Sequence, residues 1–97
     1  MTTETQLVTI VEKPKVILQL AALVLEQEDN LANIEAARKA GLYADKESFC
    51  EDLEDANDSH LIAMIAYQAA LSLMRGKRID EEQTSTLRTA LCITGSL

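Results

Sequence analysis

The only histidine in the sequence, His60, is the side chain best suited to move protons near neutral pH. Asp58 and Ser59 precede it, so a carboxylate, a hydroxyl and an imidazole could form a short proton relay. Asp and Ser also cap the free amides that begin a helix. We favour that second interpretation, which places His60 in the partly exposed first turn of a helix. Little else in the sequence would complete an active site, so we expect no enzyme.

The two cysteines, Cys50 and Cys92, are far apart and lack the C-x-x-C spacing of zinc and redox sites. With one histidine available they form neither a zinc site nor a disulfide framework. Cys50 would gain thiolate character if it lay near a helix N-terminus, but a small buried apolar role is commoner for such a residue. We therefore predict a buried Cys50 and no metal ion or cofactor.

An acidic segment contains Asp55, Asn57 and Ser59 at the spacing of the first ligands of a calcium loop. Its sixth position is His60 and its twelfth is Ala66, where that loop needs glycine and glutamate, so the calcium hypothesis fails. The segment is better explained as a solvated helix face, or as a face that imitates the charges of a phosphate backbone. Its candidate partner-binding carboxylates are Glu47, Glu51, Asp52, Glu54, Asp55 and Asp58.

The densest positive cluster is Arg75, Lys77 and Arg78, which Arg88 would join if the last helix folds back. These cations could bind a small anionic ligand or the acidic surface of a partner. They are equally typical of the C-terminal end of a helix, where the dipole favours positive charge. We keep them as candidate partner-binding residues.

Length and charge restrict the class of protein. The chain has 97 residues and a formal charge of -7. Negative charge opposes direct binding to nucleic acid and to anionic lipid. The polar, acidic start lacks the pattern of a secretory signal, so we expect a cytoplasmic protein without a membrane segment. Alanine provides much of the apolar content, so the core is thin and self-association is expected.

The N-terminal segment has two interpretations. Residues 1–6 lack apolar anchors and are expected to be flexible, and residues 1–12 as a whole are predicted to be frayed or a short strand. A hairpin around Pro14 would pair the β-branched run 7–11 with residues 16–20. We prefer a helix that begins at Pro14, because proline fits the first helical turn and residues 16–28 are rich in helix formers.

Further helices follow from apolar spacing and end signals. We expect the helix from Pro14 to be buried on most of its circumference and to break or bend at residues 28–30. A second apolar stripe, with Ile34 at its centre, ends at Gly41, where Leu42 closes the turn. Ser48 and Glu51 predict a capping box that begins a helix with Phe49 on its inner face. Residues 57–59 predict another break before a core helix, 61–74, which ends at Gly76. Asp80 and Gln83 cap a last helix that ends near Gly95.

These elements predict an all-α protein, a compact bundle of four to five short helices in one domain spanning residues 1–97. The predicted function is a small acidic protein–protein interaction module, an inhibitor or accessory factor of a larger complex that also forms homo-oligomers. Small size and acidity are also common among phage accessory proteins. The alternatives are a nucleic-acid mimic that blocks a basic binding site and, third, a small anionic-ligand binder.

Overall fold

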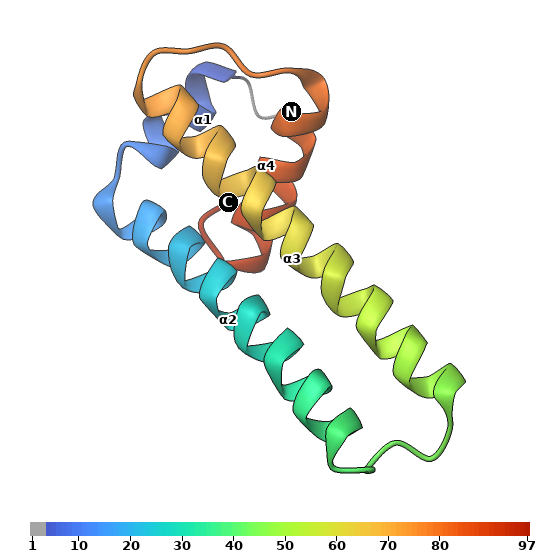
Figure 1. The fold of residues 1–97 in the computed structure, drawn as a ribbon. Coiled ribbons are helices and arrows are strands. Elements are labelled where there is room, and N and C mark those ends of the chain that lie inside the picture. Colours follow the sequence, from blue (N-terminus) through green and yellow to red (C-terminus); the bar gives the residue numbers. More distant parts are fainter. Residues whose placement is uncertain (1–3) are drawn as a thin grey trace.

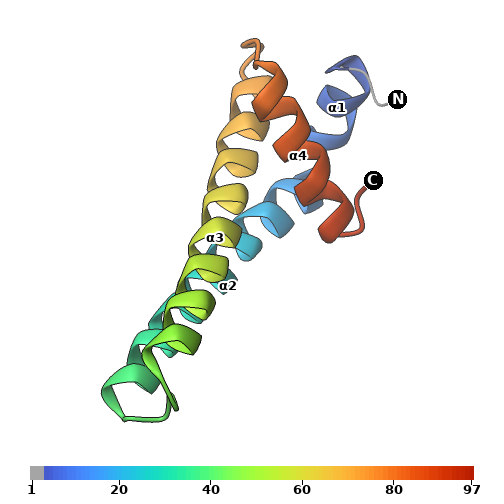
Figure 2. The same ribbon diagram turned by 90° about the vertical axis from the view of Figure 1, so that its right-hand side faces the viewer.

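The computed structural model describes residues 4–97, and this part of the chain folds into four α-helices without a strand. They are α1 (Glu4–Val11), α2 (Pro14–Lys39), α3 (Lys46–Met74) and α4 (Glu81–Ile93). The two long helices, α2 and α3, form an antiparallel hairpin, and α1 and α4 pack against its open end (Figures 1 and 2). The predicted all-α class is confirmed.

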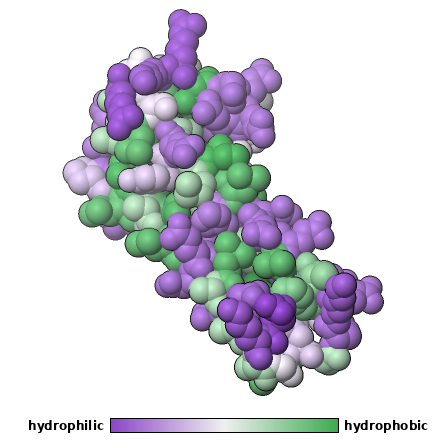
Figure 3. All heavy atoms as spheres, in the orientation of Figure 1, coloured by the Kyte–Doolittle hydropathy of each residue, from purple (hydrophilic) through white to green (hydrophobic). Residues whose placement is uncertain are grey.

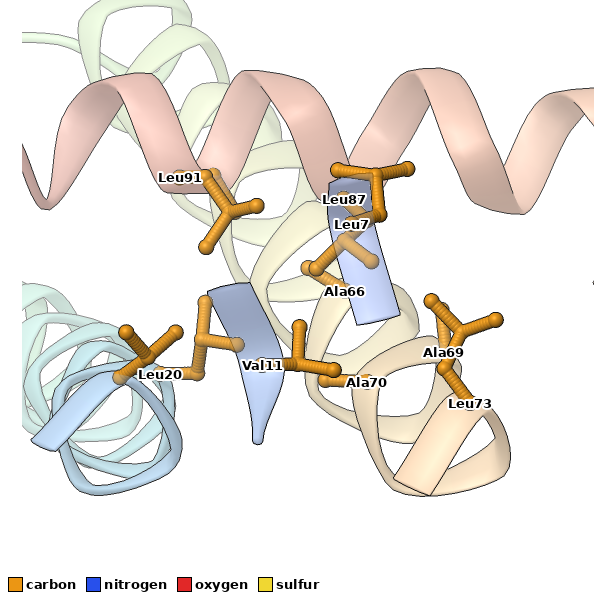
Figure 4. Packing of buried hydrophobic residues seen from close by; sticks show 11 residues of the cluster. Leu7, Val11, Leu20, Ala66, Ala69, Ala70, Leu73, Leu87 and Leu91 are labelled. Carbon is orange, nitrogen blue, oxygen red and sulfur yellow. The ribbon is translucent and has the colours of Figure 1, made fainter. Parts of the chain in front are cut away.

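The open end of the hairpin, together with α1 and α4, forms what we call the body, residues 4–26 and 61–97. Its core joins leucine and valine side chains of α1, α2 and α4 to three alanines of α3 (Figure 4). Because alanine has a single methyl group, the neighbouring helices approach the α3 backbone closely, and their larger side chains fill the space. The fully buried residues of this core include Leu7, Val11, Leu20, Ala66, Ala69, Ala70, Leu87 and Leu91.

The other half of the hairpin, residues 27–60, extends away from the body, and we call it the arm. Within this range, all of which the structure describes, Ala56 is the only buried residue. Leu31, Ile34 and Leu53 are half-buried, because the arm has only two helices to cover its apolar seam. The molecule measures 48 × 23 × 20 Å, so the helices form a bundle that is elongated and not compact as predicted.

The N-terminal segment is helical where the structure describes it, so the strand and hairpin alternatives are wrong. Leu7 and Val11 stand four residues apart, and both are buried in the body core. That burial outweighs the preference of β-branched residues for strands. Residues 4–6 belong to α1, and the predicted flexibility of residues 1–3 lies outside the described part of the chain.

Both predicted breaks are wrong, because α2 continues through residues 28–30 and α3 through residues 57–59. The inward positions keep a spacing of three and four residues across each supposed break. On α3 this series includes Leu53, Ala56, His60 and Ala63, and on α2 it includes Val24, Gln27, Leu31 and Ile34. Two continuous seams therefore produce two long helices instead of several short ones.

Several predicted helix ends are confirmed. Pro14 occupies the first turn of α2, and Asp80 forms a capping box with Gln83 at the start of α4. Gly41 has a φ of +72°, and the amide of Leu42 donates to the carbonyl of Ala37 at 3.0 Å, which ends α2 in the expected way. The predicted Ser48–Glu51 box is wrong, because Asp45 caps α3 and accepts from the amide of Ser48.

The expected burial of α2 around most of its circumference is also wrong. Val16, Leu20 and Val24 are its buried residues. On the opposite side, Leu18 and Leu25 are 69% and 60% exposed. The three other helices all lie on one side of α2, so Leu18 and Leu25 on its other side face solvent.

Candidate interaction site at the tip of the arm

The arm ends in a small aromatic cluster between the end of α2 and the start of α3. The rings of Tyr43 and Phe49 meet edge to face, with centroids 5.4 Å apart and planes at 71°. The guanidinium of Arg38 lies 5.7 Å from the centroid of the Phe49 ring, at the distance of a cation–π contact. Two of the three aromatic residues in the sequence therefore lie at the tip of the arm.

Polar contacts fix the positions of these rings. The hydroxyl of Tyr43 donates to the carboxylate of Asp52 at 3.0 Å. Burial, followed by this hydrogen bond, raises the pKa of Tyr43 above its usual value. Arg38 donates through both Nε and an Nη atom to the carboxylate of Glu35, which lowers the pKa of Glu35. The ring of Phe49 and its two neighbours are thus held by contacts to α2 and α3.

The surface at the tip combines apolar and basic groups. Leu42 is 77% exposed, and a shallow hollow of about 520 Å³ is lined by Arg38, Tyr43, Asp45, Lys46 and Phe49. In the space-filling view the lower end of the molecule carries both green and strongly purple side chains (Figure 3). Aromatic rings and arginine are the residues that most often provide binding energy in protein interfaces.

The predicted acidic residues lie next to this tip, in the first half of α3, and all of them are exposed. Glu47, Glu51, Glu54 and Asp58 recur at three and four residues, with Asp55 beside them, so they share one side of the helix. No ion pair joins these five carboxylates to a basic residue within residues 4–97. Asp52 belongs to the tip instead, because it accepts from Tyr43.

The predicted basic cluster is at the opposite end of α3. Arg75, Lys77 and Arg78 are exposed in the connection from α3 to α4 (orange in Figure 1). A helix rises about 1.5 Å per residue, so most of the length of α3 separates them from the acidic residues. The structure does not bring the two predicted groups into one site.

His60 and the cysteines occupy positions other than those predicted. His60 lies in the middle of α3, half-buried in the seam of the hairpin, with Nε2 3.5 Å from a carboxylate oxygen of Glu28. Cys50 is exposed and not buried, and Cys92 is exposed as well. In the described part of the chain, no three His, Cys, Asp or Glu side chains are grouped as metal ligands would be.

The tip is not among the candidate sites predicted from the sequence, although a signal for it is present there. Phe49 is predicted to lie on an inner helix face and Leu42 to close a turn. Both assignments are locally reasonable, because Phe49 is half-buried and Leu42 follows Gly41. The missed signal is that two of the three aromatic residues, Tyr43 in the loop and Phe49 near the start of α3, lie six positions apart in a chain poor in aromatics.

No protein-family model, no curated protein and no solved structure matches this chain. Among the described residues, none of the helices has the length and apolar character needed to span a bilayer.

Proposed function

We propose that this protein is a protein–protein interaction module without catalytic activity, and that the tip of its arm is the contact surface. The observation that supports this proposal is the exposed Leu42 beside Arg38, Tyr43 and Phe49. A folded protein gains little from a leucine that is 77% exposed, whereas a partner that covers it gains apolar burial. Rigid rings next to that leucine lose little conformational freedom on binding.

The position of the tip also supports this role. The core of the body contains no residue from the tip, so the tip can vary without loss of the main core. The arm holds the tip away from the body, where it can reach a recessed surface of a larger complex. By occupying such a surface the protein would act as an inhibitor or accessory factor.

The experiment compares three tagged proteins in affinity capture from the native host: the wild type, Leu42→Asp, and Ile93→Asp as a control. Ile93 is 63% exposed at the end of α4, in the body. We expect wild type and Ile93→Asp to capture the same protein, and Leu42→Asp to lose it, with equal helical circular dichroism in all three. Capture that is unaffected by Leu42→Asp would contradict the proposal.

A second candidate, nucleic-acid mimicry, is favoured by the acidic side of α3. Its five exposed carboxylates lack a basic partner in the described chain, so their field is directed at solvent. Replacing Glu51, Glu54 and Asp58 together by lysine should then abolish capture of a basic partner, and added DNA should displace the wild-type protein from it. If the triple variant captures the partner as before, mimicry is excluded.

A further inference from the structure

The outward side of α2 carries a second series of residues at heptad spacing. Lys15, Leu18, Ala22, Leu25 and Asp29 are separated by three, four, three and four residues, and all five are exposed. They lie opposite Val16, Leu20 and Val24, the residues that face the body and α3. We call these five residues the outer face of α2. This spacing is that of a seam between two helices, but within residues 4–97 no helix covers it.

The shape of the outer face suits another helix. Ala22 lies between the larger Leu18 and Leu25 in this series, and a hollow of about 690 Å³ beside it borders Ala22, Leu25 and the polar residues Glu26, Gln27, Asp29, Asn30 and Asn33. A small residue flanked by two large ones allows two helices to approach closely while their leucines interdigitate. The outer face thus presents both knobs and a space into which a knob can fit.

The positions of the charged residues along the outer face indicate which kind of helix would bind there. Lys15 is at the N-terminal end of the outer face, and Glu26 and Asp29 are at the other end. Neither Lys15 nor Asp29 forms an ion pair within the part of the chain that the structure describes. In a parallel pair of such helices like charges would meet, whereas in an antiparallel pair centred at Ala22 each Lys15 faces the Asp29 of the other copy. The face is therefore complementary to itself under two-fold symmetry.

We propose that two copies of this chain associate through the outer face of α2, antiparallel, with the two-fold axis at Ala22. Leu18 and Leu25 of each copy then surround the paired Ala22 residues, and two Lys15–Asp29 pairs close the ends. This interface is separate from the tip of the arm, so it does not rest on the function proposed above. The two surfaces can also be tested separately.

Sedimentation equilibrium over a range of protein concentrations tests this association. We expect wild type to form a dimer, and Leu25→Asp to raise its dissociation constant more than tenfold. Leu42→Asp, at the tip, should dimerise as wild type does. A monomer at all concentrations would overturn the proposal, and so would a dimer weakened by Leu42→Asp but not by Leu25→Asp.

A charge exchange tests the antiparallel arrangement. Lys15→Glu and Asp29→Lys should each weaken the dimer by up to about tenfold, because each change disrupts two symmetry-related surface pairs. The double variant Lys15→Glu/Asp29→Lys should recover the affinity of the wild type, since it restores both pairs with reversed sign. A double variant that is no tighter than the single ones would refute this pairing, and circular dichroism checks that every variant remains folded.

Discussion

At the scale of single residues, Asp45 determines where α3 begins. Its carboxylate accepts from the amide of Ser48 at 2.7 Å, and this hydrogen bond lowers the pKa of Asp45 below its ordinary value of 3.8. The sequence also offered Ser48 with Glu51, which has the form of a capping box. The two alternatives differ by one helical turn, and the residue types alone do not decide between them. The preceding turn at Gly41 and the contact of Phe49 with Tyr43 favour the earlier start.

We predict that Asp45→Asn reduces the melting temperature at pH 7 and that this reduction becomes smaller as the pH falls toward 2. The ionised carboxylate is preferred in the folded state, because its pKa there is lowered. Its stabilising contribution is therefore complete above pH 3.8 and is lost as the pH falls through the folded pKa. Asparagine keeps the capping geometry but does not titrate. Thermal unfolding of both proteins between pH 2 and 7 measures the difference, and a difference that does not change with pH would contradict the prediction.

At the scale of elements, sequence predicted the helical class and most helix ends but not the helix lengths. Pro14, Gly41, Gly76 and the Asp80–Gln83 box act locally, so residue type is sufficient to find them. The polar triplets at residues 28–30 and 57–59 also resemble ends. Whether such a triplet ends a helix depends on the seam on either side, which becomes visible only when α2 and α3 are paired. The tip was missed for another reason, because Phe49 was predicted to face inward and its contact with Tyr43, six positions earlier in the connecting loop, appears only in the fold.

Two proline variants test the continuity of α3. Asp58→Pro lies inside the helix, so it should remove a backbone hydrogen bond and cost about 3 kcal/mol or more. Lys46→Pro is the matched control at the first helical position, where proline is tolerated and the extended backbone of Asp45 is compatible with it. Urea unfolding followed by circular dichroism provides both free energies. Equal stability of the two variants would show that α3 is broken near residue 58.

At the scale of the whole molecule, the main hydrophobic core and the proposed contact surface lie at opposite ends. The body contains the contiguous core, whereas the arm has a two-helix seam with half-buried apolar residues. The amides of the arm should therefore exchange hydrogen faster than those of the body, because local opening of the arm exposes less apolar surface.

Two leucine substitutions measure this asymmetry. Leu87 is fully buried in the body, so Leu87→Ala should cost about 2–5 kcal/mol, including the cavity that it leaves. Leu53 is half-buried in the arm, where solvent can fill the space, and Leu53→Ala should cost about 1 kcal/mol. Urea unfolding at pH 7 gives both values. A cost at Leu53 equal to that at Leu87 would mean that the arm contributes as much to folding as the body does.

The heptad seam of the hairpin makes the arm a spacer of adjustable length. Removing or adding seven residues in each of α2 and α3 would change its reach by about 10 Å and rotate the tip by only about 20°. The capped loop at one end and the packed core at the other would keep their own contacts. Related chains could therefore reach binding surfaces that are recessed to different depths by gaining or losing whole heptads. Neither the loop at the tip nor the core of the body would need to change.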